Sequence, residues 1–330
     1  MNPTTTFEAN MRTPGYTIQL QPRDITILRG LFESRVMTAV HIADIYFYGR
    51  KEAAKKRLQK LRAAGLIAER PRRAYEPAVL SLTKGGLLLL DEHGILAEYP
   101  AFSMNALEKR ARVSDATIQH ELEVMDVKAA FYAALRGHET FSIAEFGTWP
   151  RLYEFATTSS KGSDLLVKPD GFLRINEKEP NGGIVEHTFF IEVDRSTEIQ
   201  DILVSRAFAY LDYYRSGNFA IRNGGTRSEF KNYPFRVLMV VRTKERRNNL
   251  VDRLLEHSPP ILTFISLATK GEVRENTLRP IWISPIDYRE ALAKTASEPK
   301  QKNGNGGHPR TTTRETQIEK AIKKTTLIAL

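Results

Sequence analysis

Three acidic residues in the second half of the chain have the spacing of a carboxylate site. Asp170 lies in a Pro-Asp-Gly tripeptide between two short predicted strands, and Glu192 and Asp194 close an apolar run. Residues two apart on a strand point to the same face, so Glu192 and Asp194 are expected side by side, with Asp170 joining them from the neighbouring hairpin. Clustered carboxylates repel one another unless a cation offsets their charge, and Mg²⁺ prefers such oxygen ligands. The pattern indicates a candidate Mg²⁺ site held by Asp170 and Glu192.

Asp170 and Asp194 also have purely structural interpretations. Pro-Asp-Gly is a common turn sequence, and Asp194 followed by Arg195 is compatible with a salt bridge at a strand end. Several other chemistries have no support. The chain has no cysteine, which excludes disulfides, thiolate zinc sites and thiol nucleophiles. It also has no phosphate-binding glycine loop, no pair of histidines at metal spacing and no Gly-x-Ser-x-Gly nucleophile motif.

A second set of functional candidates is basic and lies near the N-terminus. The whole chain carries a net charge of +10, and residues 50–73 hold ten Lys or Arg against two Glu. A helix predicted over Lys51–Ala64 buries Ala54, Leu58 and Leu61 and ends at Gly65. The opposite face is positive, which suits a polyanion. The candidate groove-contacting residues are Lys51, Lys55, Lys56, Gln59 and Lys60.

The elements around this basic helix predict a winged helix-turn-helix over residues 20–93. Two helices precede it, over Arg23–Glu33 and after an N-cap at Thr38, and two short strands and a further helix follow. In that fold the third helix lies in the major groove and the loop between the strands touches the DNA backbone. The candidate phosphate contacts in that loop are Arg70, Arg72 and Arg73. The alternative is a solvated basic helix beside an unrelated hairpin.

The rest of the chain predicts an α/β domain built on one mixed sheet. Residues 1–19 are expected to be a flexible leader and residues 94–114 a connector. Residues 115–290 begin with a long helix and continue with alternating strands and helices. One strand, Phe235–Val241, is almost continuously apolar and is therefore expected inside the sheet. Residues 291–330 hold eight Lys or Arg against three Glu and low-complexity sequence, which predicts a basic, disordered tail.

The acidic pattern resembles that of the PD-(D/E)xK nuclease superfamily. Pro169-Asp170 is followed by a strand that ends in Glu192-x-Asp194, although most active members have lysine where this chain has Asp194. The whole chain resembles the bacterial replication-relaxation family, over about residues 20–255. The residues that carry the second resemblance are Leu20–Leu31, the basic helix and loop, His120-Glu121, Pro169-Asp170 and the string Phe190–Glu198.

These resemblances imply a winged helix joined to a restriction-endonuclease-like domain. Asp170 and Glu192 would be metal ligands, Asp194 would replace the lysine, and Glu121 would be an additional helix carboxylate. Arg195, Glu198, Arg206 and Tyr210 would surround them. Catalysis by these residues stays open, and a degenerate, non-catalytic domain is favoured because the lysine is missing.

The function predicted from the sequence is a plasmid or mobile-element replication/relaxation factor that binds double-stranded DNA. The alternatives are a Mg²⁺-dependent DNA nickase and a winged-helix transcriptional regulator. Other replication or relaxation proteins and a second copy of the chain are compatible partners, and Mg²⁺ is the compatible cofactor. We expect a cytoplasmic protein without membrane association, because no apolar run approaches the roughly 20 residues that span a bilayer and no signal peptide is recognisable.

Overall fold

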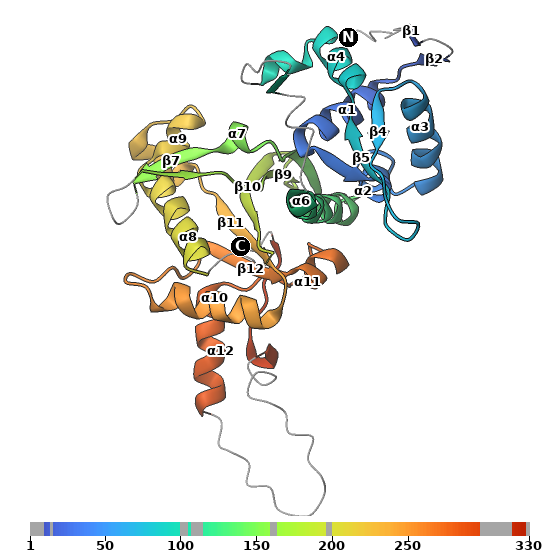
Figure 1. Ribbon diagram of the computed structural model, residues 1–330. Helices are drawn as coiled ribbons and strands as arrows, with labels where there is room; N and C mark the ends of the chain where they lie inside the picture. The colour runs from blue at the N-terminus through green and yellow to red at the C-terminus, as the bar shows by residue number, and fades with distance from the viewer. Residues whose placement is uncertain are drawn as a thin grey trace, which may run out of the picture. The chain divides into compact units, whose positions relative to one another are not determined.

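The computed structural model describes residues 10–13, 16–99, 105–106, 115–158, 164–195, 200–297 and 319–327 (Figure 1). The chain divides into two compact units. The first unit comprises Met1–Glu154, Asp170–Phe172 and Asn176–Gly183, and the second comprises Phe155–Pro169, Leu173–Ile175 and Ile184–Leu330.

Three helices near the N-terminus of the first unit bury their apolar sides in a common core. They are α1 (Pro22–Ser34), α2 (Ala39–Tyr46) and α3 (Lys51–Ala63). Pro22 occupies the first turn of α1, where the missing N–H costs nothing. The Thr38 hydroxyl accepts a hydrogen bond from the His41 N–H at 3.2 Å and caps α2, as predicted. Among the core residues that these helices bury almost completely are Ile27, Leu28, Leu31, Ile42, Ala54 and Leu61.

A three-stranded antiparallel sheet packs with these helices, in the order β3-β5-β4. Strands β4 (Ile67–Glu69) and β5 (Val79–Leu82) are the predicted pair. Strand β3 (Val36–Thr38) was not predicted, because a three-residue strand between two helices is too short to show a period of two. Gly65, with φ of +69°, turns the chain from α3 into β4.

The remaining elements of the first unit include several that the sequence did not indicate. Helix α4 (Lys84–Glu92) and the long helix α6 (Asp115–Ala134) were predicted, but α6 belongs to the first compact unit. Ahead of α1, β1 (Asn10–Thr13) and β2 (Tyr16–Gln19) form an antiparallel pair inside the expected flexible leader. The other elements are the 3-10 helix η1 (Ile95–Glu98), β6 (Phe141–Gly147) and α7 (Pro150–Tyr153). Most of the expected connector, residues 94–114, lies outside the described residues.

A five-stranded mixed sheet has the order β12-β11-β10-β9-β6. Strands β10 (Ile184–Val193), β11 (Arg236–Val241) and β12 (Ile265–Thr269) run parallel to one another. Every residue of β11 after Arg236 is buried, so the prediction of an interior strand is confirmed. The pairing of β12 with β11 runs from Ile265 to Thr269. Strand β9 spans Gly171–Lys178.

Helices connect the parallel strands of the second unit, as in a crossover arrangement. Helix α8 (Gln200–Arg215), α9 (Asn218–Arg222) and the 3-10 helix η2 (Arg227–Asn232) lie between β10 and β11. Helix α10 (Lys244–Glu256) lies between β11 and β12. The unit also contains the two-stranded antiparallel pair β7 (Phe155–Thr158) and β8 (Asp164–Val167), and helices α11 (Lys270–Glu275) and α12 (Pro285–Ser297).

The disordered tail predicted over residues 291–330 is wrong for the residues that the structure describes there. Helix α12 extends to Ser297, and within residues 319–327 the side chains of Ile322 and Leu327 are buried. Thr325 forms a β-bridge with Trp282. The apolar side chains of this C-terminal segment are too widely spaced to show the periodicity of a helix or strand in the sequence. They are nevertheless sufficient to pack against the rest of the second unit.

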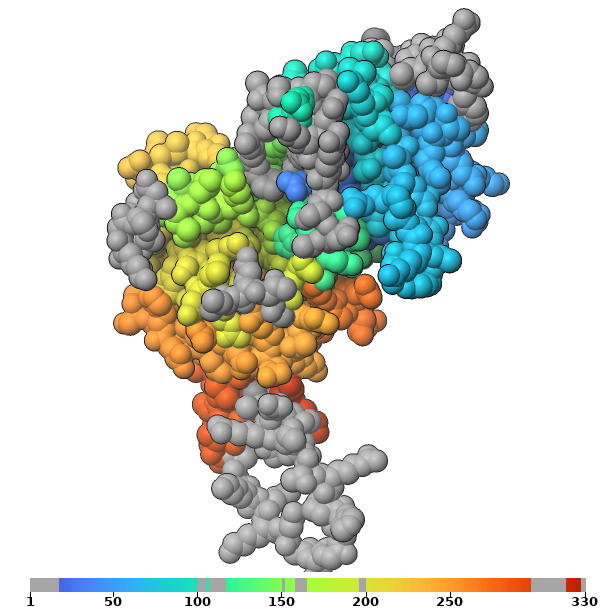
Figure 2. Space-filling view, in the orientation of Figure 1, coloured from blue at the N-terminus to red at the C-terminus, as the bar shows by residue number. Residues whose placement is uncertain are grey.

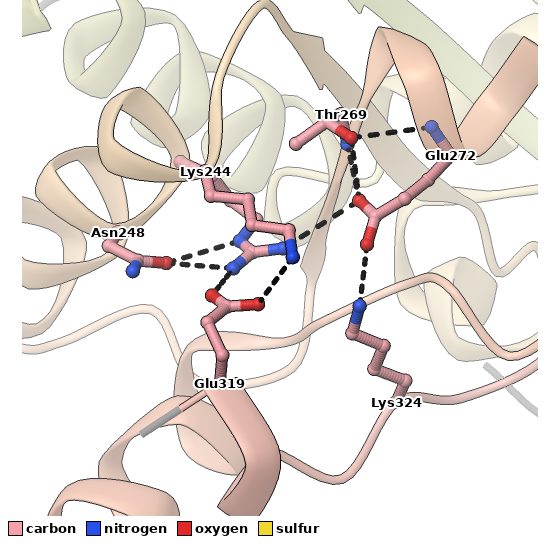
Figure 3. A network of polar contacts seen from close by, with 7 residues as sticks. Lys244, Asn248, Thr269, Glu272, Glu319 and Lys324 are labelled. Atoms are coloured by element: carbon pink, nitrogen blue, oxygen red, sulfur yellow. Dashed lines mark hydrogen bonds and ion pairs between the residues drawn. The ribbon is translucent and has the colours of Figure 1, made fainter. Parts of the chain in front are cut away.

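Charged side chains fix the C-terminal segment to the second unit (Figure 3). The guanidinium of Arg247 is fully buried and donates to Glu319 and, at 3.0 Å, to Asn248. Lys324 donates to Glu272 at 2.5 Å, and the Glu272 carboxylate also accepts from the backbone N–H of Thr269 at 2.9 Å. The segment therefore supplies one anion and one cation to a buried polar network.

Among the described residues, no helix is long and apolar enough to cross a membrane.

Candidate functional site

Helix α3 separates its residues into an apolar face and a basic face. Ala54, Leu58 and Leu61 are buried in the core of the first unit. The five residues predicted to contact a groove are all exposed, and they lie on the remaining surface of the helix: Lys51, Lys55, Lys56, Gln59 and Lys60. In Figure 2 the light-blue atoms of this part of the chain lie at the molecular surface. Four of these five side chains are lysines, and Glu52 is the one exposed acidic residue of the helix, so this surface carries a net positive charge.

Arg57 has a different role from the lysines around it. Its Nε donates to Asp24 at 2.7 Å, and its Nη2 donates to the carbonyl oxygen of Gln19 at 2.9 Å. Asp24 is fully buried, so this ion pair ties the middle of α3 to the start of α1. A buried carboxylate needs such a partner. Sequence reasoning missed the pair because its members are 33 residues apart.

The β4–β5 loop, residues 70–78, is held in shape by its own charged groups. Arg72 donates from Nε to Glu69 at 2.8 Å and from Nη1 to the carbonyl oxygen of Glu76 at 2.8 Å. The hydrogen bond from Arg72, with the positive charges of Arg62 and Arg72, lowers the pKa of Glu69. Arg72 is exposed, but its hydrogen bonds to Glu69 and Glu76 hold the loop in its conformation.

Arg73 and Tyr75 form the outer part of the same loop. Arg73 Nη1 donates to the Tyr75 hydroxyl at 2.9 Å, and the Tyr75 side chain is 77% exposed. Arg70, the third arginine predicted here, is half-buried. An aromatic ring this exposed is an available contact surface, and the sequence analysis did not single it out.

Glu192 and Asp194 lie at the carboxyl end of β10 and are almost completely buried. Glu192 accepts from the Tyr210 hydroxyl at 2.5 Å and from Arg206 Nη1 at 3.1 Å. The contacts expected from Arg206 and Tyr210 on the following helix are thus present. Asp194 accepts from Arg246 Nε at 2.7 Å and from Arg246 Nη2 at 3.3 Å. Both carboxylates have an arginine as their counter-ion.

Asp170 and Glu121 belong to the first compact unit and also have basic partners there. Asp170 accepts from His120 Nε2 at 2.8 Å, and this hydrogen bond raises the pKa of His120 despite its partial burial. The neighbouring charges of Glu121 and Glu123 act in the same direction. Glu121 itself pairs with Arg35 at 3.3 Å. His120 is thus the partner of the acidic residue predicted to bind metal.

These partners bear on the predicted Mg²⁺ site. In the part of the chain that the structure describes, no three His, Asp or Glu side chains are grouped so that they could hold a metal ion. Both oxygens of Glu192 and both oxygens of Asp194 already accept hydrogen bonds from tyrosine or arginine. A hard cation needs several free oxygen ligands. The residues as arranged do not fit a divalent-cation site.

Comparison with protein-family models identifies a family for this chain. The model of the replication-relaxation family matches residues 28–228 of the chain. No curated protein and no solved structure matches it.

Proposed function

Because the chain belongs to the replication-relaxation family, we propose that it binds double-stranded DNA through the first compact unit. In this proposal residues 20–93 form a winged helix-turn-helix. Helix α3 enters the major groove, and the β4–β5 loop is the wing that touches the backbone. Plasmid or mobile-element replication and relaxation is the process it serves.

The observation that carries the proposal is the division of α3 into a buried apolar face and an exposed basic face. Four exposed lysines, Lys51, Lys55, Lys56 and Lys60, lie on one short helix. Lysine side chains neutralise phosphates and release the counterions bound to DNA, which supplies most of non-specific affinity. Gln59, between them, is a residue type that can read adenine in the major groove.

We propose that Arg73 and Tyr75 are the wing contacts and that Arg72 is a structural residue. Arg72 uses its guanidinium to bridge the two ends of the loop, through Glu69 and Glu76. Arg73 and Tyr75 are both exposed. This assignment refines the expectation that all three arginines of the loop contact phosphates.

The restriction-endonuclease-like interpretation of the second half of the chain is likewise a proposal. It is supported by a mixed sheet with Glu192 and Asp194 at one strand end. We propose that this part contacts DNA or a protein partner without cutting, because Arg206 and Arg246 neutralise the carboxylates that a nuclease would use for metal.

Fluorescence anisotropy with a labelled duplex tests DNA binding. The test variant replaces Lys55, Lys56 and Lys60 with Ala, and the matched control replaces three exposed lysines elsewhere, Lys178, Lys231 and Lys294. Both variants lose the same charge, so only the position differs. We expect affinity to fall at least about tenfold in the first and to change little in the second. Equal losses would contradict a localised interface.

A further inference from the structure

A cavity of about 850 Å³ lies in the second unit, at the amino-terminal ends of the parallel strands. Its walls come from the start of β10, the end of α8, η2 and the residues that lead into β11 and β12. Glu192 and Asp194 lie at the opposite end of β10, so this cavity is separate from the acidic residues. Its volume falls within the roughly 300–1,000 Å³ of small-molecule sites.

One wall of the cavity is aromatic. Tyr214, Phe230 and Phe264 line it and are partly exposed. Their rings pack against one another, with centroids 5.2 Å apart for Tyr214 and Phe230 and 5.7 Å apart for Tyr214 and Phe264. Phe235 packs against Phe264 from the core, at 5.2 Å. Rings held in place in this way offer a preformed surface on which a flat ligand can stack.

The cavity also has two arginines that no acidic side chain neutralises. Arg236 donates from Nη1 to the carbonyl oxygen of Thr263 at 2.6 Å, and Arg215 is exposed. Within the described residues, neither forms an ion pair. Burial lowers the pKa of Arg236, since the guanidinium has lost part of its hydration.

The other ionisable groups that line the cavity do not form ion pairs with Arg215 or Arg236 in the described part of the chain. They are Glu186, His187 and the Tyr214 hydroxyl. Glu186 lies 3.6 Å from Arg174, which is outside the lining, so its charge is partly offset there. An anionic group on a ligand would therefore meet two cations at the cavity.

We propose that this cavity binds a nucleotide unit, with its base packed against the aromatic wall of Tyr214, Phe230 and Phe264 and its phosphate paired with Arg215 and Arg236. Aromatic side chains stack with any base, and arginine forms charge-assisted hydrogen bonds with phosphate. The nucleotide is either free in solution or part of a single DNA strand. Both sources present the same base and phosphate.

Isothermal titration calorimetry of the full chain tests this proposal with four ligands. They are adenosine 5′-monophosphate, adenosine, ribose 5-phosphate and a 5′-phosphorylated tetrathymidylate. Binding of the monophosphate, about tenfold or more tighter than that of adenosine or ribose 5-phosphate, supports a free nucleotide. Binding of the oligonucleotide without binding of the monophosphate assigns the site to a DNA strand. If neither ligand binds, the proposal is wrong.

Variants decide whether the binding occurs in this cavity. Arg215→Gln removes an exposed cation and should keep the fold, and Arg236→Gln and Phe230→Ala alter the half-buried part of the lining. Arg227→Gln is the matched control, because Arg227 is exposed in the same unit and does not line the cavity. We expect about a tenfold loss for Arg215→Gln and none for Arg227→Gln. Equal affinity of these two variants for the ligand would overturn the proposal.

Discussion

Arg246 donates to both carboxylate oxygens of Asp194, from Nε at 2.7 Å and from Nη2 at 3.3 Å. Asp194 follows β10 directly, and Arg246 lies in the first turn of α10, which follows β11. Because β10 and β11 are parallel neighbours, the two residues meet at one edge of the sheet. Asp194 is almost completely buried, so this ion pair bears on stability and on whether the carboxylate is available to a metal.

Replacing Arg246 with Met should lower the free energy of unfolding by about 3–5 kcal/mol, because Asp194 would stay buried without a counter-ion. Urea denaturation measures this. The matched control is Arg253→Met on the same helix, whose ion pair with Asp201 is exposed and should contribute less than about 1 kcal/mol. Adding Asp194→Asn to the Arg246 variant should recover part of the loss. Similar stability of the two single variants would refute a structural role for the pair.

The His120–Asp170 hydrogen bond should make stability depend on pH. The pKa of His120 is raised in the folded protein above its ordinary value of 6.5. A group with a raised folded pKa stabilises fully below its unfolded pKa, and this contribution disappears as pH rises through the folded value. The stability difference between the wild type and Asp170→Asn should therefore be largest in acid and shrink above neutrality. A pH-independent difference would show that the hydrogen bond does not govern His120 protonation.

The C-terminal segment should stabilise the second unit through Glu319. Glu319→Ala leaves the fully buried Arg247 without one of its charged partners, and we expect a loss of about 2 kcal/mol in the free energy of unfolding. Lys320→Ala, an exposed neighbour, is the control and should change stability little. If chemical denaturation gives the same midpoint for both variants, the segment does not contribute through this contact.

Millimolar MgCl₂ should leave the melting temperature unchanged and should produce no nicking of supercoiled plasmid. Ligands that bind the folded state raise its apparent stability, and the two predicted Mg²⁺ ligands, Glu192 and Asp170, are already paired with Arg206 and His120. Gel electrophoresis and thermal denaturation measure the two effects. Plasmid nicking that requires Mg²⁺ and is abolished by both Asp170→Ala and Glu192→Ala would establish the nickase alternative instead.

Local sequence patterns predicted most helices and strands but few of the ionic contacts. The apolar stripe of Ala54, Leu58 and Leu61 was readable because it repeats at helical spacing. The pairs Arg57–Asp24 and Arg246–Asp194 join residues 33 and 52 positions apart, respectively, and no single-sequence pattern encodes such a separation. For the same reason, the contact between Glu319 and Arg247, 72 positions apart, could not be predicted from the sequence. The expected proximity of Arg206 and Tyr210 to Glu192 came from a family resemblance.

The most direct test of the proposed function is the salt dependence of duplex binding. For each phosphate contact that is lost, the slope of log K against log [salt] should fall by about 0.9. The variant without Lys55, Lys56 and Lys60 should therefore have a slope smaller by about 2–3 than the wild type. The variant without Lys178, Lys231 and Lys294 should keep the wild-type slope. An unchanged slope in the α3 variant would contradict DNA binding through this helix.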